Sequence, residues 1–191
     1  MKPWKLLSLL LQYPDHELVA ARDELERAAS GLGQIERFLA CQRELPLGAL
    51  QQAYVQTFDF DRRASLYLTY HTHGDRRQRG LELVRLKRRF AEAGLPLTGS
   101  ELPDYLPALL EFAALEPVEG EALLNELRAP LELTRSRLHQ TGSAYADLLD
   151  ALVAALPKPT RAQLAAAQRL AEEGPPEELV GLEPFTAEVA S

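Results

Sequence analysis

ELPDYLPALLEFAAL, residues 101–115, carries the clearest secondary-structure pattern of this chain. Its apolar residues recur at intervals of three and four, the spacing that places side chains on one face of an α-helix. They are Leu102, Tyr105, Leu106, Leu109, Leu110 and Ala113. Pro107 fits a helix only in the first turn, where the missing N–H has no intrahelical partner. The stretch therefore predicts a helix with a buried apolar stripe and an N-cap close to Asp104.

Helical periodicity extends over most of the 191 residues. Glycine and proline fall between the periodic segments and divide the chain into about eight or nine helices. The expected helices cover residues 3–13, 14–30, 34–44, 47–58, 75–94, a segment from about 104, 118–139, 143–156 and 160–173. Pro130 lies inside one of these segments, where we expect a kink or a break. Alternating β-branched runs and repeats of 20–50 residues are absent from the sequence, which predicts an all-α fold, a single irregular helical bundle.

Two helix starts carry the spacing of a capping box, in which a small polar residue is followed three positions later by Glu or Gln. Thr160 and Gln163 form one such pair, and Asp75 with Gln78 resembles the other. We expect the first pair to open the last helix and Asp75 to open a long basic helix that ends at Gly94.

The length suggests one compact body, which we assign to residues 1–173. Residues 174–191, GPPEELVGLEPFTAEVAS, contain four glutamates and no basic residue, and we expect them to form an acidic, proline-containing C-terminal extension. Lys2 and Lys5 precede a leucine-rich run, as basic residues do in a secretory signal peptide. Acidic residues follow this run closely, which favours a buried first helix over a signal peptide.

Composition argues against several classes of protein. The net charge of −7 disfavours a nucleic-acid-binding protein, although the basic helix around residues 76–89 resembles a phosphate-binding stripe. The longest apolar runs are much shorter than the ~20 residues that a transmembrane helix needs, so we expect no membrane insertion. A single cysteine, Cys41, favours a reducing compartment, and we expect a cytoplasmic location.

The charge is divided unevenly along the chain. Residues 59–93 hold nine basic and five acidic side chains, whereas residues 94–127 hold seven acidic side chains and no basic one. Two interpretations remain open. The acidic segment is either a surface that steers a basic partner, or its carboxylates neutralise the neighbouring basic helix.

Catalytic signatures are missing from the sequence: it has no phosphate-binding glycine loop, no GxGxxG, no HExxH and no GxSxG. We therefore expect a protein that is not an enzyme. His71, His73 and Asp75 are the remaining candidates for chemistry, because imidazole and carboxylate ligands suit zinc or copper. Two histidines two residues apart point about 200° apart on a helix, so this metal-binding alternative requires an extended segment.

Two motifs resemble a known family. Residues 54–68, YVQTFDFDRRASLYL, continue through Tyr70-His71 to the segment ending at Gly80, and ELPDYLP covers residues 101–107. Both resemble the nitrate reductase delta subunit, or NarJ, family of the TorD/DmsD/NarJ group of redox-enzyme maturation proteins. The resemblance implies a TorD-like, all-helical cytoplasmic chaperone that is not an enzyme and holds no cofactor stably. By the same resemblance, it binds the N-terminal segment of the catalytic alpha subunit of respiratory nitrate reductase, or of a different molybdenum oxidoreductase, and assists insertion of the molybdenum cofactor before membrane attachment.

Nine residues in and around the motifs are candidates for partner binding. They are Tyr54, Phe58, Ser65, Tyr67, His71, Arg79, Glu101, Asp104 and Tyr105. Tyr54 and Phe58 share one helical face, which either lines a peptide groove or packs in the core. The other residues of the first motif either hold its loop or touch the partner. Glu101 and Asp104 begin the acidic segment and are placed to meet basic residues of a client, unless Asp104 is a helix cap.

Overall fold

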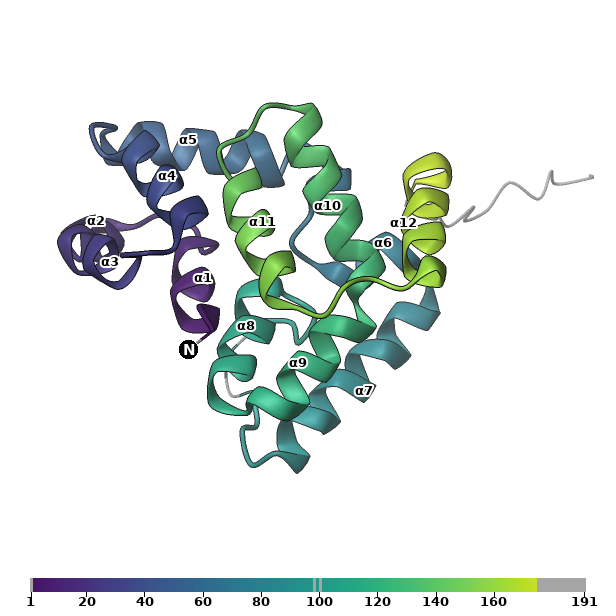
Figure 1. Cartoon of the computed structure of the whole chain (residues 1–191). Helices are drawn as coiled ribbons and strands as arrows, with labels where there is room; N and C mark the ends of the chain where they lie inside the picture. Colours follow the sequence, from purple (N-terminus) through teal and green to yellow (C-terminus); the bar gives the residue numbers. More distant parts are fainter. Residues whose placement is uncertain (1, 98, 100, 175–191) are drawn as a thin grey trace, which may run out of the picture.

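The computed structural model describes residues 2–97, 99 and 101–174, which form a bundle of α-helices (Figure 1). Within these residues there are twelve α-helices, one 3₁₀ helix and no strand. The first half comprises α1 (Trp4–Leu10), α2 (His16–Ala20), α3 (Arg22–Ala28), α4 (Gly33–Gln42), α5 (Leu47–Phe58), the 3₁₀ helix η1 (Arg62–Ala64), α6 (Leu68–His73) and α7 (Arg77–Glu92). The second half comprises α8 (Leu106–Leu115), α9 (Pro117–Glu126), α10 (Arg128–Gln140), α11 (Ala146–Ala155) and α12 (Arg161–Glu173). The expected all-α class is confirmed.

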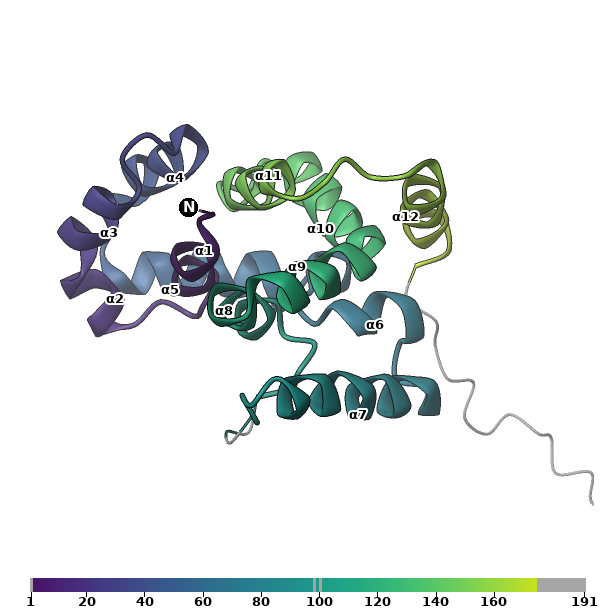
Figure 2. The same ribbon diagram turned by 60° about the horizontal axis from the view of Figure 1, so that its bottom comes forward.

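One leucine-rich core joins the helices from α1 to α11. Leu7 of α1, Leu109 of α8 and Leu131 of α10 are fully buried in it. Helices α2, α3 and α4 gather at one end of the bundle, while α7 lies along an edge and α12 packs on α10 (Figures 1 and 2). Burial of these apolar side chains is the main favourable term in the folding free energy.

The helix count exceeds the expected eight or nine because several segments are divided. The expected helix over 14–30 breaks at Ala21 into α2 and α3, and the less regular stretch before Gly74 contains η1 and α6. The segment 118–139 breaks at Leu127, which places Pro130 in the first turn of α10. The break expected near Pro130 is thus confirmed, since a first-turn proline lacks only an N–H that has no intrahelical partner.

The expected first-turn position of Pro107 and the expected Thr160 capping box are confirmed, whereas the expected Asp75 cap is wrong. Pro107 occupies the first turn of α8, and Thr160 opens α12 with a complete capping box. In that box Thr160 Oγ1 accepts a hydrogen bond from the Gln163 N–H at 3.2 Å. Asp75 does not cap α7, whose N-cap is Arg76 without a side-chain bond. The Asp75 carboxylate instead lies 3.9 Å from Arg79, one helical turn further on.

Helices α8 and α9 approach each other very closely at Gly120. A Cβ atom added to Gly120 would lie 2.3 Å from Cα of Ala113, well inside van der Waals contact. Only glycine therefore fits at this crossing.

Within the described residues, we find no helix that combines the length and apolar character needed to cross a membrane. The expected C-terminal extension lies outside the described residues beyond Gly174.

Candidate functional site

The two sequence motifs are joined by a short backbone pairing. Tyr67 and Tyr105 form an isolated antiparallel bridge. Around it, the Leu68 N–H donates to the Asp104 carbonyl at 3.0 Å and the Leu106 N–H donates to the Leu66 carbonyl at 2.8 Å. Segments far apart in the sequence are thereby fixed side by side at the start of α6 and of α8.

Asp104 is the buried centre of this junction. Its side chain is fully buried, and its Oδ2 accepts hydrogen bonds from the Thr69 N–H at 3.3 Å and the Thr69 hydroxyl at 2.5 Å. Thr69 is the second residue of α6, so the carboxylate caps α6 rather than α8. The N-cap of α8 is Tyr105, and the expectation that Asp104 caps its own helix is wrong. The bridge turns this carboxylate toward α6, whose free N–H groups attract an anion.

Arg79 supplies the positive charge that Asp104 needs in a buried position. Its Nη2 lies 3.3 Å from Asp104 Oδ2, and its side chain is only 17% exposed. The guanidinium also lies over the rings of Tyr67 and Tyr70, at 5.9 and 5.7 Å from their centroids. These contacts compensate two charges that would be costly to bury alone.

His71 and Ser65 hold the loop that precedes α6. His71 is buried, and its Nε2 lies 2.9 Å from the Ser65 carbonyl and 3.2 Å from the Thr134 hydroxyl. A carbonyl oxygen only accepts, so Nε2 carries the hydrogen. Burial lowers the pKa of His71, although the carboxylates of Asp104 and Asp61 oppose that shift. The Ser65 hydroxyl accepts from the Tyr67 N–H at 3.2 Å, which closes the turn.

Tyr54 and Phe58 pack in an aromatic cluster of the core. Each is 6% exposed, and both rings contact Tyr145. The Tyr54 hydroxyl lies 3.2 Å from the Leu11 carbonyl and 3.1 Å from the hydroxyl of Tyr105. Burial raises the pKa of Tyr54 above its ordinary value and that of Tyr145 to about 12. Of the two interpretations of this face, the structure favours core packing.

All nine candidate residues form one connected cluster, which we call the motif hub. Tyr67 completes it, because its hydroxyl donates to Glu101 Oε1 at 3.0 Å and its ring lies 5.1 Å from that of Tyr105. Burial and the Glu101 carboxylate raise the pKa of Tyr67 above its ordinary value. Glu101 is the exposed member of the hub.

Sequence reasoning missed three side chains that complete the hub, Thr69, Tyr70 and Thr134. The first two lie within the first motif, so their position was the available signal. Thr134 lies on α10, outside both motifs, and nothing in its local sequence distinguishes it.

Most of the acidic segment is neutralised by basic side chains. Glu126 lies 2.8 Å from Arg89 and 3.2 Å from Arg85, and Glu119 lies 2.6 Å from Arg89. Partial burial would raise the pKa of Glu126, but its bonds to Arg89 and Arg85 outweigh burial and lower the pKa. These ion pairs support neutralisation of the basic helix over an open acidic surface.

The proposed metal ligands do not come together. His71 uses Nε2 within the hub, and Asp75 pairs with Arg79. In the part of the chain that the structure describes, no group of three His, Cys, Asp or Glu side chains is placed to hold a metal ion.

The motif hub also positions one wall of a groove between α6, α7, the α9–α10 junction and α12. We call it the α6–α12 groove, a cavity of about 580 Å³. It is lined by Thr69, Thr72, His73, Glu82, Arg85, Glu126, Leu127, Ala129, Pro130, Ala166, Arg169, Leu170 and Glu173. Thr69 belongs to both the motif hub and the groove, because its hydroxyl donates a hydrogen bond to Asp104 and the residue also lines the groove. The groove combines an apolar strip with charged side chains of both signs.

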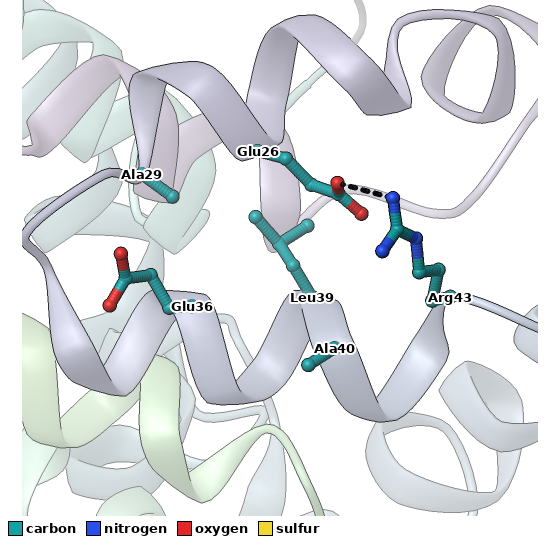
Figure 3. Close-up of a pocket in the computed structure, with 6 residues that line it drawn as sticks. All are labelled: Glu26, Ala29, Glu36, Leu39, Ala40 and Arg43. Atoms are coloured by element: carbon teal, nitrogen blue, oxygen red, sulfur yellow. Dashed lines mark ion pairs between the residues drawn. The ribbon is translucent and has the colours of Figure 1, made fainter.

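A second pocket lies between α3 and α4, away from the motif hub (Figure 3). It measures about 220 Å³, and Glu26 and Arg43 form an ion pair of 3.2 Å at one side of it. Leu39 projects between the two helices (Figure 3). Neither motif contributes a residue to this pocket.

Comparison with known proteins identifies the family. A family model described as nitrate reductase delta subunit matches residues 22–151. A probable nitrate reductase molybdenum cofactor assembly chaperone NarJ of Bacillus subtilis is 36% identical over 157 residues, which cover 78% of this chain and 85% of the relative. The nitrate reductase molybdenum cofactor assembly chaperone NarJ of Escherichia coli K12 is 38% identical over 161 residues, covering 78% of this chain and 66% of the relative. The nitrate reductase-like protein NarX of Mycobacterium tuberculosis H37Rv is 36% identical over 155 residues, although the match covers only 23% of that relative. Both motifs of the hub lie within the matched residues, and the chain therefore belongs to the nitrate reductase delta subunit family.

Proposed function

We propose that this protein is a dedicated cytoplasmic chaperone for respiratory nitrate reductase. In this proposal it binds the N-terminal segment of the catalytic alpha subunit and assists insertion of the molybdenum cofactor before the complex attaches to the membrane. It acts by binding and performs no catalysis of its own. The observation that carries the proposal is family membership together with relatives named as molybdenum cofactor assembly chaperones.

The α6–α12 groove is the surface that we assign to the client segment. Its apolar strip consists of Leu127 and Pro130, which are mostly buried, and the half-buried Leu170, and charged side chains of both signs also line the groove. Amphipathic peptides bind grooves of this kind, with apolar side chains supplying affinity and the charged rim fixing register. Its volume of about 580 Å³ suits a few peptide side chains.

The motif hub supports this groove rather than forming its surface. Asp104 and Arg79 hold Thr69 at the start of α6, and His71 ties the same helix to α10. A site held by buried hydrogen bonds loses little conformational entropy when a ligand binds. Glu101 remains as an exposed hub residue that can meet a basic client side chain directly.

The test uses titration calorimetry with a synthetic peptide of the alpha subunit's N-terminal segment. Leu170→Glu places a charge in the apolar strip, and we expect it to weaken peptide binding at least tenfold. Leu164→Glu is the matched control, because Leu164 lies on the same helix, is 43% exposed and does not line the groove. Circular dichroism checks that both variants fold. Equal affinities for the two variants would exclude the groove as the client site.

Assembly is tested in cells that express nitrate reductase. We expect the molybdenum content of the purified catalytic subunit to fall when Leu170→Glu replaces the wild-type chaperone and to stay unchanged with Leu164→Glu. Peptides from the N-terminal segments of other molybdenum oxidoreductases identify the preferred client in the same calorimetric assay. If the molybdenum content does not depend on the chaperone at all, the proposed function is wrong.

A further inference from the structure

The outer face of α7 exposes two large aliphatic side chains. Leu86 and Phe90 bury the opposite face of this helix in the core. Leu81 and Val84 are each 67% exposed, and their spacing of three residues places them side by side on the helix surface. Figure 2 shows α7 as the outermost helix on its side of the molecule. Single exposed leucines are ordinary, whereas adjacent aliphatic side chains on an outer helix point to a contact surface.

Basic side chains continue this face in both directions along the helix. Arg77 lies four residues before Leu81, and Arg88 lies four residues after Val84, so both share its outer side. Lys87 flanks them, and all three basic side chains are exposed. We call these five residues the α7 outer stripe. It extends over about 17 Å, at a rise of about 1.5 Å for each residue.

The charges of the α7 outer stripe are largely uncompensated. Arg89, on the inner side of α7, pairs with carboxylates of α9. Arg77 and Lys87 form no ion pair with another residue that the structure describes. Arg88 pairs with Glu92, but the two side chains are 78% and 61% exposed, and pairs of this kind contribute little. The stripe therefore suits an anionic partner.

The composition of the α7 outer stripe favours a lipid surface among anionic partners. Nucleic acids are held mainly through their phosphates, which would leave Leu81 and Val84 unused at the centre of the stripe. Protein interfaces depend on aromatic side chains in matching pockets, and the stripe has no aromatic residue and lies on a convex, single helix. An anionic bilayer attracts each nearby basic side chain and accepts aliphatic side chains between its headgroups. A flat surface can also contact the whole stripe at once.

We propose that the α7 outer stripe binds anionic lipid surfaces. In this contact α7 lies parallel to the bilayer, Leu81 and Val84 enter the headgroup layer, and the three basic side chains contact lipid phosphates. The contact is peripheral and reversible, and it needs no membrane-spanning helix. It is independent of the proposed client site, because neither Leu81 nor Val84 lines the α6–α12 groove.

Cosedimentation of the full chain with lipid vesicles tests the proposal without any substitution. We expect binding at low salt to vesicles of phosphatidylcholine mixed with phosphatidylglycerol, and much weaker binding to vesicles of phosphatidylcholine alone. Added sodium chloride should release the protein, because salt screens the attraction between basic side chains and lipid phosphates. Absence of binding to the anionic vesicles at low salt, or equal binding to both kinds of vesicle, would overturn the proposal.

The contribution of charge is measured with Arg77→Gln combined with Lys87→Gln. We expect about thirtyfold weaker binding to the anionic vesicles, since each basic side chain near such a surface contributes about fivefold. The matched control is Lys158→Gln combined with Arg161→Gln. It removes the same two side-chain types from exposed positions around the start of α12. Equal weakening in both proteins would assign the binding to net charge and refute a site on α7.

The contribution of the aliphatic pair is measured with Leu81→Ser combined with Val84→Ser. We expect about tenfold weaker vesicle binding, because less apolar surface leaves water. The matched control is Leu115→Ser combined with Val118→Ser at the α8–α9 turn, where the side chains are 59% and 89% exposed. Circular dichroism checks that every variant folds.

Unchanged vesicle binding after substitution of the aliphatic pair would refute insertion of the stripe. Two further probes separate the other anionic partners, a DNA duplex and a synthetic acidic amphipathic peptide. Binding of either probe in place of the vesicles would assign the stripe to nucleic acid or to a protein partner, and the lipid proposal would then be wrong.

Discussion

Asp104 illustrates how much a single carboxylate contributes when it joins two motifs. It is fully buried and bonds to the backbone and hydroxyl of Thr69 and to Arg79. Asp104→Ala leaves the Thr69 N–H and hydroxyl without their acceptor, and it leaves the Arg79 guanidinium with only the more distant Asp75 carboxylate, at 3.9 Å. Loss of one member of a buried pair costs about 3 kcal/mol or more. We therefore expect the urea-unfolding free energy to fall by about 3 kcal/mol.

Glu101→Gln is the control for that measurement. Glu101 is exposed and lies in the same motif, and glutamine can still accept the Tyr67 hydroxyl bond. Its effect on the unfolding free energy should stay within about 0.5 kcal/mol. Comparable losses for the two variants would mean that burial of Asp104 is not the decisive factor.

His71 makes stability depend on pH in a definite direction. Burial lowers the pKa of His71 in the folded protein below its value in the unfolded chain, so protonation favours unfolding. The contribution is fully present above the unfolded pKa of about 6.5 and decreases as the pH falls below that value toward the folded pKa. The loss from this group approaches about 1.4 kcal/mol per pH unit between the two pKa values.

The measurement is the urea-unfolding free energy between pH 7.5 and pH 5. We expect His71→Gln to give a shallower decrease over this range than the wild-type chain. His73→Gln, on the same helix, serves as the control and keeps the wild-type slope. An unchanged slope in His71→Gln would assign the acid sensitivity to other groups.

Among the elements, the contact between α8 and α9 is the most demanding sterically. The Cβ of alanine at position 120 would lie 2.3 Å from Cα of Ala113, and this backbone atom has no free space to move away. Overpacking costs typically 1 to 3 kcal/mol, and we expect Gly120→Ala to lower the unfolding free energy by about 3 kcal/mol.

Gly80 provides the opposite case within α7. A Cβ atom added there meets no atom within 4 Å, and the residue lies inside a helix. Gly80→Ala should raise the unfolding free energy by about 0.5 to 1 kcal/mol, because alanine lowers the backbone entropy of the unfolded chain. Urea titration of both variants checks the pair, and a destabilised Gly80→Ala would contradict the open surface on this side of α7.

At the scale of the helices, sequence predictions that depend on contacts between neighbouring residues were correct, whereas those that depend on contacts between distant residues were not. Pro107 and the Thr160 capping box act within one helical turn, and both predictions were correct. Asp104 binds residues that lie 35 and 25 positions away, so its local sequence pointed to the wrong helix. The motif hub could be located from its two motifs, but the pairing of Tyr67 with Tyr105 depends on tertiary packing that periodicity does not describe.

For the molecule as a whole, the prediction is that residues 1–173 unfold as one unit. One core cluster includes residues from Trp4 to Leu156, with no separate second core among the described residues. Trp4 is the single tryptophan and is 2% exposed. Its fluorescence therefore reports on the N-terminal end of the core, whereas far-ultraviolet circular dichroism reports on all helices. Coincident urea midpoints for the two signals are expected of a single cooperative domain, and separate midpoints would show two folding units.

The Tyr67–Tyr105 bridge also limits how members of this family can exchange parts. The Asp104 carboxylate of the second motif binds the Thr69 hydroxyl and the Arg79 guanidinium of the first motif. Neither motif therefore contains all the hydrogen-bond and charge partners that its own side chains need. A chimera with a crossover between residues 79 and 101 would combine halves of two different hubs. Chimeras are therefore expected to fold better when both motifs come from the same parent protein. The two motifs are separate in the sequence but must be exchanged together.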